Sequence, residues 1–564
     1  MNKRINLLRK KFKKYNIDGY IVSKNDDYFT EYSKINRLEI ISNFTGSAGL
    51  AIILKNKNYL FTDGRYTIQS QIESGKDFKI VNYDKIINFD LVKNLTLGID
   101  PKLFTYEQIK KFFLKNNKIK FIEKNLIDEI KNKKIKDNFK FFSLKREIVG
   151  ESSRSKINKI AKYLIKSKSD YLLVSAPENV AWILNIRGGD GPNSPVPNSR
   201  LVISKTKKIF LISKIYKTEK LIKDKIIKSK EVIDVNKFHQ DIVKLNGKNF
   251  IIDEKSCSIF YEDIIKSKFK IVKREDPTYL LKSVKNKIEI NNTINSHIID
   301  GVALTKFIYW IKNINKKKIT EVEAQNKLEK FRKMNENYLY PSFDTIAGSG
   351  ENGAIVHYRA KKENCRTINK TDIFLCDSGG QYKYGTTDVT RTICFSKPKS
   401  QIKDIFTKVL KGHIAVANTD LKKDNTGKKI DARARKFLNK SNLDYAHGTG
   451  HGVGFFLNVH EGPQAITKIN SIKIKEGMIL SNEPGYYQKG KFGIRIENLV
   501  FVKKNKNKIF FENLTLAPIE KDLINYKLLS SEEKNYLFKY HLNVYSKISK
   551  FLNANERRWL ASYV

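Results

Sequence analysis

Five side chains of this sequence could together bind metal ions. They are four carboxylates and one imidazole, each within a short segment that is rich in glycine or alternates between apolar and polar residues: Asp377, Asp388, His451, Glu483 and Glu497. Carboxylates can bridge two hard or borderline divalent cations, and an imidazole adds a nitrogen ligand. Two ions about 3.5–4 Å apart can share and activate one water molecule for attack on an amide. The set therefore predicts a dinuclear metallohydrolase.

A first expected hairpin would bring two of the carboxylates together. Residues 373–377 are apolar and typical of a strand, and residues 385–393 alternate with a period of two. With a turn near Tyr382 and Lys383, Asp377 would face Asp388 across the pair. Cross-strand partners lie about 4.5–5.5 Å apart at Cβ, so these carboxylates would repel each other unless a cation lay between them.

A second expected hairpin follows the same logic. Residues 482–485 and 492–497 flank a turn at residues 488–491, which would place Glu483 opposite Glu497. The alternative is that the four acids only flank surface turns. Their apolar strand contexts disfavour that alternative, because an isolated buried charge is costly.

The histidines of the chain gather around the same motifs. The chain has 8 histidines, and four lie in or near these segments: His357, His447, His451 and His460. The i, i+4 spacing of His447 and His451 would suit a helical zinc site. The glycines of HGTGHGVG instead favour an extended, closely approached backbone. One imidazole is then a ligand, and the others suit proton transfer or oxyanion stabilisation; a buried histidine with a structural role explains any single one, but not the cluster.

These motifs carry a family resemblance. The segments SFDTIAGSGENGAIVHYR, CDSGGQYKYGTTDVTRT, HGTGHGVG, VHEGP, NEPGYY and FGIRIEN closely resemble the X-prolyl aminopeptidases, or aminopeptidase P, of the pita-bread, creatinase/prolidase-like superfamily. RLEIISNFTGSAGLAIIL, ENVAWILNIRGGD and the tail with NLTLAPIEKDLI resemble the long, three-domain form. The resemblance covers essentially the whole chain.

The resemblance implies roles for the five ligands. Asp388 and Glu497 would bridge both ions, Asp377 would bind one, and His451 with Glu483 would bind the other. Glu483 would also act as general base beside the shared water. Two divalent ions per chain are expected, most simply Mn²⁺; oxygen-rich ligation agrees with manganese, but the residues would equally permit cobalt or zinc.

Four further residues receive roles through the resemblance. His460 and His357 match positions that stabilise the tetrahedral intermediate and transfer protons, and His357 also contributes to the substrate site. His447 matches a position that lines the pocket for the proline ring. Arg495 lies two residues before Glu497, on the same face of the strand, where it can orient or neutralise the carboxylates.

The expected substrates are peptides with proline at position 2. The bond before proline is a tertiary amide without an N–H, so a peptidase that relies on that donor loses a contact. A site that packs the ring and polarises the carbonyl avoids the problem. The acidic ligands could also receive the free terminal ammonium, which would restrict cleavage to the first residue.

The organisation of the chain is expected to be α/β (α+β), with an internal duplication. Residues 18–23 and 170–175 share a pattern, follow basic helix-like runs and precede alternating apolar segments, which predicts two homologous α/β domains. With the resemblance, the domains become creatinase-like over 1–147 and 148–281, a pita-bread catalytic domain over 282–510 and a C-terminal extension over 511–564. A long helical stretch is expected from Lys282 to about residue 315.

The composition of the chain predicts the cellular compartment of the protein and limits its binding partners. Four isolated cysteines (Cys257, Cys365, Cys376 and Cys394) have no metal or redox spacing and indicate a reducing compartment. The basic start lacks an apolar core of the signal-peptide kind, and no apolar stretch reaches membrane-spanning length, so the cytoplasm is expected. The net charge of +49 is spread as lysine. Without clustered arginine or interleaved aromatics it predicts no dedicated nucleic-acid or membrane site.

Several alternatives stay open on the sequence. Prolidase and methionine aminopeptidase share the ligands, but the doubled N-terminal domains and the extension argue against both. A metal-free enzyme of the creatinase type would not need the complete ligand set. A non-enzymatic pita-bread binding module with a basic surface would have lost ligands, and all five are present. A homodimer is expected from the family alone.

Overall fold

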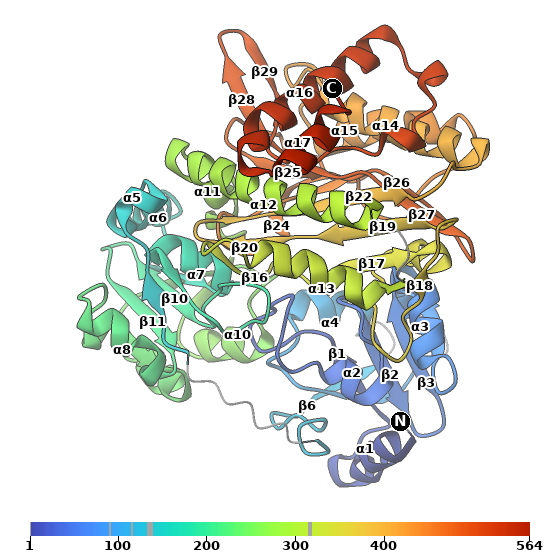
Figure 1. Cartoon of the computed structure of the whole chain (residues 1–564). Coiled ribbons are helices and arrows are strands. Elements are labelled where there is room, and N and C mark those ends of the chain that lie inside the picture. Colours follow the sequence, from blue (N-terminus) through green and yellow to red (C-terminus); the bar gives the residue numbers. More distant parts are fainter. Residues whose placement is uncertain (1, 89–91, 114–116, 132–138, 314–317) are drawn as a thin grey trace. The chain divides into compact units, whose positions relative to one another are not determined.

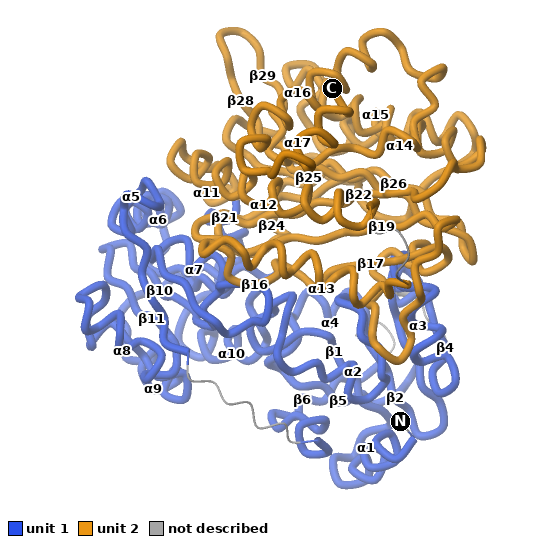
Figure 2. Tube along the Cα trace, viewed as in Figure 1, with its two compact units in different colours: residues 1–279 blue, residues 280–564 orange. Residues whose placement is uncertain are grey.

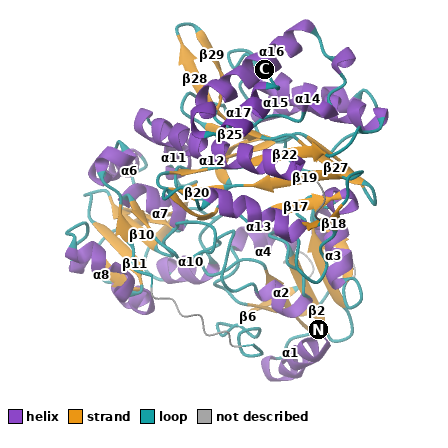
Figure 3. Ribbon diagram, in the orientation of Figure 1, coloured by secondary structure: helices purple, strands orange, loops and turns teal. Residues whose placement is uncertain are grey.

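The computed structural model describes residues 2–88, 92–113, 117–131, 139–313 and 318–564 (Figure 1). The chain divides into two compact units, residues 1–279 and residues 280–564 (Figure 2). Helices and strands are mixed in both units, as the α/β (α+β) prediction requires (Figure 3).

The first half of unit 1 is built on a six-stranded sheet with the order β4-β3-β2-β1-β5-β6. Its central strand, β1, pairs antiparallel with β2 and parallel with β5. Buried aliphatic residues on both faces make β1 and β2 core strands. The strands are β1 (Gly19–Ser23), β2 (Leu50–Leu54), β3 (Asn58–Thr62), β4 (Lys79–Asn82), β5 (Thr96–Ile99) and β6 (Lys118–Phe121).

The second half of unit 1 repeats this topology. Its sheet has the order β12-β11-β10-β8-β13-β14, and the central β8 again pairs antiparallel on one side and parallel on the other. The predicted duplication is therefore confirmed in the arrangement of the strands. They are β8 (Tyr171–Val174), β10 (Arg200–Ser204), β11 (Ile209–Ser213), β12 (Val232–Asp234), β13 (Asn249–Ile252) and β14 (Lys270–Lys273), with a separate pair of β7 (Phe142–Ser143) and β9 (Ile186–Arg187).

Amphipathic helices cover these sheets. In the first helix Ile5, Leu8 and Phe12 are buried, and its lysines lie on the other faces. The helices of unit 1 are α1 (Asn2–Tyr15), α2 (Arg37–Ser42), α3 (Thr67–Ser74), α4 (Tyr106–Phe112), α5 (Arg146–Val149), α6 (Ser153–Lys166), α7 (Pro177–Leu184), α8 (Ile215–Lys223), α9 (Phe238–Ile242) and α10 (Ile259–Lys266). Most of the Lys- and Asn-rich segment expected to end the first domain lies outside the described residues.

Unit 2 carries its strands in several small antiparallel sheets. One has the order β17-β19-β22, another β16-β20-β21, a third β24-β23-β25-β28-β29, and β26 pairs with β27 alone. The strands are β16 (Tyr338–Pro341), β17 (Ile346–Ser349), β19 (Ile373–Ser378), β20 (Gly380–Tyr382), β21 (Gly385–Thr386), β22 (Val389–Cys394), β23 (Gly450–Gly452), β24 (Glu461–Ile466), β25 (Ile479–Asn482), β26 (Gly485–Gln488), β27 (Phe492–Arg495), β28 (Asn498–Asn505) and β29 (Lys508–Asn513), with β15 (Ile319–Thr320) paired to β18 (Thr367–Ile368).

Helices of unit 2 pack on these strands through shared apolar clusters. α12 and α13 contribute to a cluster with β19 and β22, while α14, α15, α16 and α17 share another with β27. The helices are α12 (Lys287–Asn313), α13 (Glu321–Arg332), α14 (Ser400–Ala417), α15 (Gly427–Asn439), α16 (Ser531–Ile548) and α17 (Ala554–Ala561). The C-terminal segment is thus part of the core of this unit.

The long helical stretch predicted from Lys282 is interrupted. α11 (Thr278–Ser283) ends before α12 begins, because the side-chain oxygen of Asn286 accepts from the backbone N–H groups of Ile288 and Glu289 and starts a new helix. The predicted end near Asn315 lies outside the described residues. Within the described part of the chain, no helix has the length and apolar character needed to cross a membrane.

Candidate metal centre

The first pair of carboxylates comes from the β19–β22 ladder of unit 2 (Figure 1). Asp377 lies on β19, and Asp388 directly precedes β22. The predicted pairing of the two is wrong, because Asp377 pairs with Thr390. The hairpin turns at Lys383 and Tyr384, one residue later than predicted, which moves every cross-strand partner by two. Since side chains alternate with a period of two, Asp388 still lies on the face of Asp377.

The second pair lies where two sheets meet, and here the predicted register is confirmed. Gly485 pairs with Arg495 in the β26–β27 hairpin, and Asn482 pairs with Asn498 in the β25–β28 ladder. Both ladders have the same register, which places Glu483 opposite Glu497 in the gap between them. The predicted turn at residues 488–491 is also present, closed by a bond from the Lys491 N–H to the Gln488 carbonyl.

Two backbone hydrogen bonds bring the separate segments together. The N–H of Glu497 donates to the carbonyl of Thr390 at 3.2 Å, which joins the second hairpin to the first. The N–H of Glu483 donates to the carbonyl of Thr449 at 2.8 Å, which joins it to the histidine segment. Because both glutamates lie between ladders, their N–H groups are available for these links.

His451 lies on β23, so the extended backbone predicted for the glycine-rich segment is confirmed. A side chain at Gly450 would collide with the carbonyl oxygen of Ser481, which explains the glycine beside the histidine. Nδ1 of His451 lies 2.8 Å from the carbonyl oxygen of Gly452. That contact fixes Nδ1 as the protonated nitrogen and leaves Nε2, 3.5 Å from Oε1 of Glu483, with a lone pair for a metal.

The five predicted ligands form overlapping groups. Ligand atoms of Asp377, Asp388 and Glu497 lie within 4.8 Å of one another, as do those of His451, Glu483 and Glu497. Asp388 also forms such a group with His451 and His460. Asp388, Glu497 and His451 therefore each belong to two groups, and of these three only the two carboxylates have two oxygens with which to bind two neighbouring ions.

The protonation of this cluster favours a cation. Burial raises the pKa of Asp388 and Glu497 well above the ordinary range, and repulsion among the carboxylates adds to it. Burial also raises the pKa of Asp377, against the pull of Arg495. For Glu483, burial opposes ionisation, but neighbouring basic groups, first His451, hold its pKa below the usual value. Divalent ions would replace the protons that this crowding retains.

One atom of the cluster fits a metal directly. Oδ1 of Asp377 is buried without a hydrogen-bond partner, while Oδ2 accepts from Nη2 of Arg495 at 2.6 Å. A buried carboxylate oxygen is normally satisfied, so an orphaned one that faces further carboxylates fits a cation ligand. The donor set, four carboxylates and one imidazole, suits hard or borderline divalent ions.

Arg495 connects the carboxylates to the imidazole of His447. Its guanidinium also donates to the Tyr487 hydroxyl at 2.5 Å, and that hydroxyl lies 2.8 Å from Nε2 of His447. His447 is half-buried beside the ring of Tyr445, and burial lowers its pKa to about 4, so the imidazole is neutral near pH 7.

The two remaining histidines lie in different settings. The ring centroid of His460 is 4.3 Å from that of His451, and its side chain is exposed. This places His460 at the edge of the ligand cluster. His357 lies in the segment that follows residues 350–354 and is half-buried.

Two contacts were missed by the sequence analysis. Thr390 donates to Oε2 of Glu497 at 2.8 Å and accepts from Nε of Arg495 at 3.0 Å. Tyr487 joins Arg495 to His447. Both lie inside motifs that the sequence analysis used, and the alternation of DVTRT would have placed Thr390 on the face of Asp388.

The family models match four consecutive segments of the chain. Residues 4–129 and 133–289 each match the creatinase/prolidase N-terminal domain, residues 292–504 match metallopeptidase family M24, and residues 508–563 match the C-terminal region of peptidase M24. Together with the ligand cluster, this defines a metallopeptidase of family M24 with two creatinase-like N-terminal domains and a pita-bread catalytic domain.

Comparison with individual proteins identifies the family of this chain within the M24 metallopeptidases. The chain is 35% identical to Xaa-Pro aminopeptidase 1 of Dictyostelium discoideum, over 100% of this chain and 96% of that relative. It matches the crystal structure of the Caenorhabditis elegans X-prolyl aminopeptidase, described as a cytosolic enzyme with a di-nuclear active site, at 28% identity and TM-score 0.92 over 100% of this chain and 99% of the other. The Pyrococcus horikoshii prolidase matches at 26% identity and TM-score 0.53, over 65% of this chain and 99% of the other. This chain belongs to the X-prolyl aminopeptidase family.

Proposed function

We propose that this protein is a metal-dependent Xaa-Pro aminopeptidase that releases the first residue from peptides with proline at position 2. The observation that carries the proposal is the convergence of all five ligands in a chain that matches an X-prolyl aminopeptidase over its full length. A binding module without activity would not need the complete set. Prolidase is less well supported, because the prolidase match covers 65% of this chain.

The overlapping groups support the following roles for the five ligands. Asp388 and Glu497 would each bridge two ions, Asp377 would complete one site, and His451 with Glu483 would complete the other. When bound, two divalent ions polarise the scissile carbonyl and make water a nucleophile near neutral pH. We assign them as Mn²⁺, since four of the five ligands provide oxygen. Reconstitution of the apoenzyme with Mn²⁺, Co²⁺ or Zn²⁺ tests this assignment, and higher activity with zinc or cobalt would reject it.

Side chains of the protein would transfer protons and compensate charge during the reaction. Glu483, ionised beside His451, is the acceptor for the proton of the attacking water. His460, exposed next to His451, and His357 would donate to the oxyanion of the tetrahedral intermediate. Arg495 would keep Asp377 ionised and fixed through their 2.6 Å contact.

Proline selectivity would arise beside His447. The neutral His447 ring lies between Tyr445 and Tyr487 and would form a wall of the proline site. This wall does not need an N–H of the substrate as a hydrogen-bond donor. At the other end of the scissile bond, the carboxylates favour a free ammonium. Loss of either contact displaces the carbonyl, and a displacement of about 1 Å can cost about 10²-fold in rate.

The decisive experiment compares four peptides with the manganese-loaded enzyme: X-Pro-X, X-Ala-X, N-acetylated X-Pro-X and the dipeptide X-Pro. We expect release of the first residue from X-Pro-X alone. Comparable cleavage of X-Ala-X would reject the assignment, and a strong preference for the dipeptide would make the enzyme a prolidase.

Three further parts of the proposal concern the whole molecule. We propose a cytoplasmic homodimer, which light scattering coupled to size exclusion tests directly; a monomer would reject it.

The domains are proposed to span 1–147, 148–281, 282–510 and 511–564. Limited proteolysis should cut near these borders first, and early cuts confined to domain interiors would reject them.

A further inference from the structure

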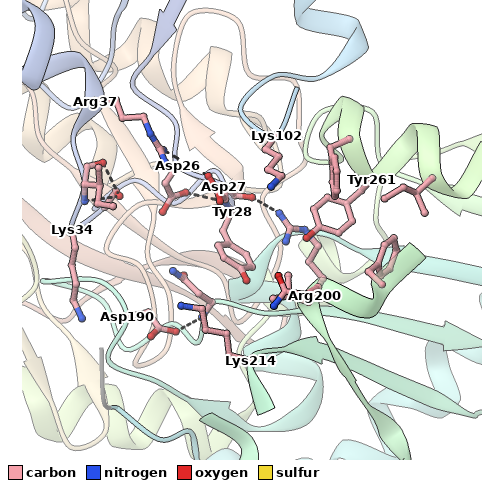
Figure 4. A pocket seen from close by; sticks show the side chains of 18 of the residues that line it. Asp26, Asp27, Tyr28, Lys34, Arg37, Lys102, Asp190, Arg200, Lys214 and Tyr261 are labelled. Atoms are coloured by element: carbon pink, nitrogen blue, oxygen red, sulfur yellow. Dashed lines mark hydrogen bonds and ion pairs between the residues drawn. The ribbon is translucent and has the colours of Figure 1, made fainter. Parts of the chain in front are cut away.

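Unit 1 contains a cavity of about 580 Å³ whose lining residues come from both of its α/β halves (Figure 4). The first half provides Tyr28 and Lys102, and the second provides Arg200, Lys214 and Tyr261. Small-molecule sites typically measure about 300–1,000 Å³, so the cavity is large enough for a metabolite. All of its lining residues belong to residues 1–279, whereas the proposed metal centre lies in residues 280–564.

Arg200 is the central feature of this cavity. Its side chain is buried, with 3% of the residue exposed, and Cζ lies 4.3 Å from the ring centroid of Tyr28 and 3.8 Å from that of Tyr261. Nη2 donates to the main-chain carbonyl of Asp27. Among the described residues, no carboxylate lies within ion-pair distance of Arg200. A guanidinium has five N–H donors and a buried charge is normally paired, so Arg200 can still bind an anion.

Two lysines add to this unpaired positive charge. Lys102 is half-buried, with Nζ 4.9 Å from the ring centroid of Phe260, and Lys214 is exposed at the cavity. In the part of the chain that the structure describes, neither forms an ion pair. Three cations without carboxylate partners therefore line one cavity.

The acids that line the same cavity already have partners. Asp190 pairs with Lys217 and accepts from the N–H of Asn198. Asp26 accepts from the hydroxyl and N–H of Thr30 and from the N–H of Tyr28.

The third acid, Asp27, lies 3.7 Å from Arg37, which itself donates two hydrogen bonds to Asp128. Among the described residues, none of these three acids lies within ion-pair distance of Arg200, Lys102 or Lys214.

We propose that this cavity binds a small organic phosphate, with the phosphate on Arg200 and Lys102 and the organic part against the aromatic wall at Phe260 and Tyr261. A phosphomonoester carries a charge of about −1.5 to −2 near pH 7, which matches two or three cations better than a single carboxylate does. The planar guanidinium also fits the oxygen geometry of phosphate.

Calorimetric titration of adenosine monophosphate into the metal-loaded full-length protein tests this proposal. We expect saturable binding of the nucleotide, weaker binding of inorganic phosphate and no binding of adenosine. Arg200→Gln should weaken nucleotide binding about tenfold or more, because charge-assisted hydrogen bonds are lost. Lys102→Gln, at a half-buried position with less risk to folding, should weaken it several-fold. Arg154→Gln, which removes an exposed charge from the same unit, should leave the affinity unchanged.

Retained peptide hydrolysis by each variant shows that it is folded. Unchanged nucleotide affinity in both Arg200→Gln and Lys102→Gln would overturn the proposal, since the nucleotide would then bind elsewhere, for example at the metal centre. Adenosine binding as tightly as its phosphate would also overturn it. So would binding of citrate without binding of the nucleotide, because the site would then prefer carboxylates.

Discussion

Glu461 is the centre of a buried ion-pair group whose disruption gives the sharpest test of the structure. Its carboxylate lies 2.9 Å from Nζ of Lys282 and also contacts Nζ of Lys285, and the exposed fractions of the three side chains are 1%, 3% and 1%. Burial lowers the pKa of Lys285, which shows how strongly this site opposes a charge. In Glu461→Gln, two buried ammonium groups would lose the carboxylate that lies between them.

The expected cost is large for a single substitution. Removing one partner of a buried ion pair costs about 3–5 kcal/mol, and glutamine retains one acceptor oxygen, so we expect about 3 kcal/mol. With an m-value of about 3 kcal/mol per molar urea, the unfolding midpoint should fall by about 1 M. The fluorescence of Trp310 and Trp559 reports on this unit. The defect should shrink as the pH rises towards the ordinary lysine pKa, because a folded lysine with a depressed pKa releases its proton before the unfolded one does, and stability rises with pH wherever the unfolded state holds more protons.

The matched control is Glu512→Gln, which removes an exposed pair with Lys503 at 2.6 Å. Exposed pairs contribute about 0–1 kcal/mol, so its midpoint should move by no more than about 0.3 M. The triple variant Lys282→Met, Lys285→Met, Glu461→Gln should recover most of the lost stability, since the apolar replacements remove the two buried ammonium charges. Equal midpoints for Glu461→Gln and Glu512→Gln would show that the buried group does not contribute as reasoned.

Three further predictions concern metal, turnover and acid stability. Asp388→Ala or Glu497→Ala should each lower the bound metal measured by mass spectrometry, and near-full metal content would contradict the bridging roles. His460→Ala should lower kcat by about 10²–10³ with metal retained, whereas parallel loss of metal and activity would make His460 a ligand. Burial lowers the pKa of His413 to about 3 and of His541 to about 4, so the unfolded state takes up protons first as the pH falls below about 6.5. Stability measured by urea unfolding should therefore drop by about 3 kcal/mol per histidine towards pH 4, and His541→Gln should reduce the slope; an unchanged slope would refute this origin.

The sequence predicted local pairing wherever a turn was well marked. The Gly490 turn, with φ of 70°, fixes the hairpin that places Glu483 opposite Glu497, and glycine at that point is a strong signal. The turn between Asp377 and Asp388 has no glycine at its tip, which is formed by Lys383 and Tyr384. Gly385 lies on β21, where a side chain would collide with Ser296 on α12. That requirement comes from packing, so a local pattern could not reveal it.

The sequence could not predict contacts between distant segments, because a local periodicity says nothing about which segments meet in space. The bond from Glu497 to Thr390 joins two hairpins about a hundred residues apart, and Glu497 lies in one group of ligand atoms with Asp377 and Asp388. Arg200, which no motif of the sequence analysis included, is buried between Tyr28 and Tyr261 from the two α/β halves of unit 1. In the candidate metal centre, the motifs predicted the site because metal binding itself requires carboxylates and an imidazole. In the cavity, the residue types are ordinary, and only their convergence indicates that an anion could bind there.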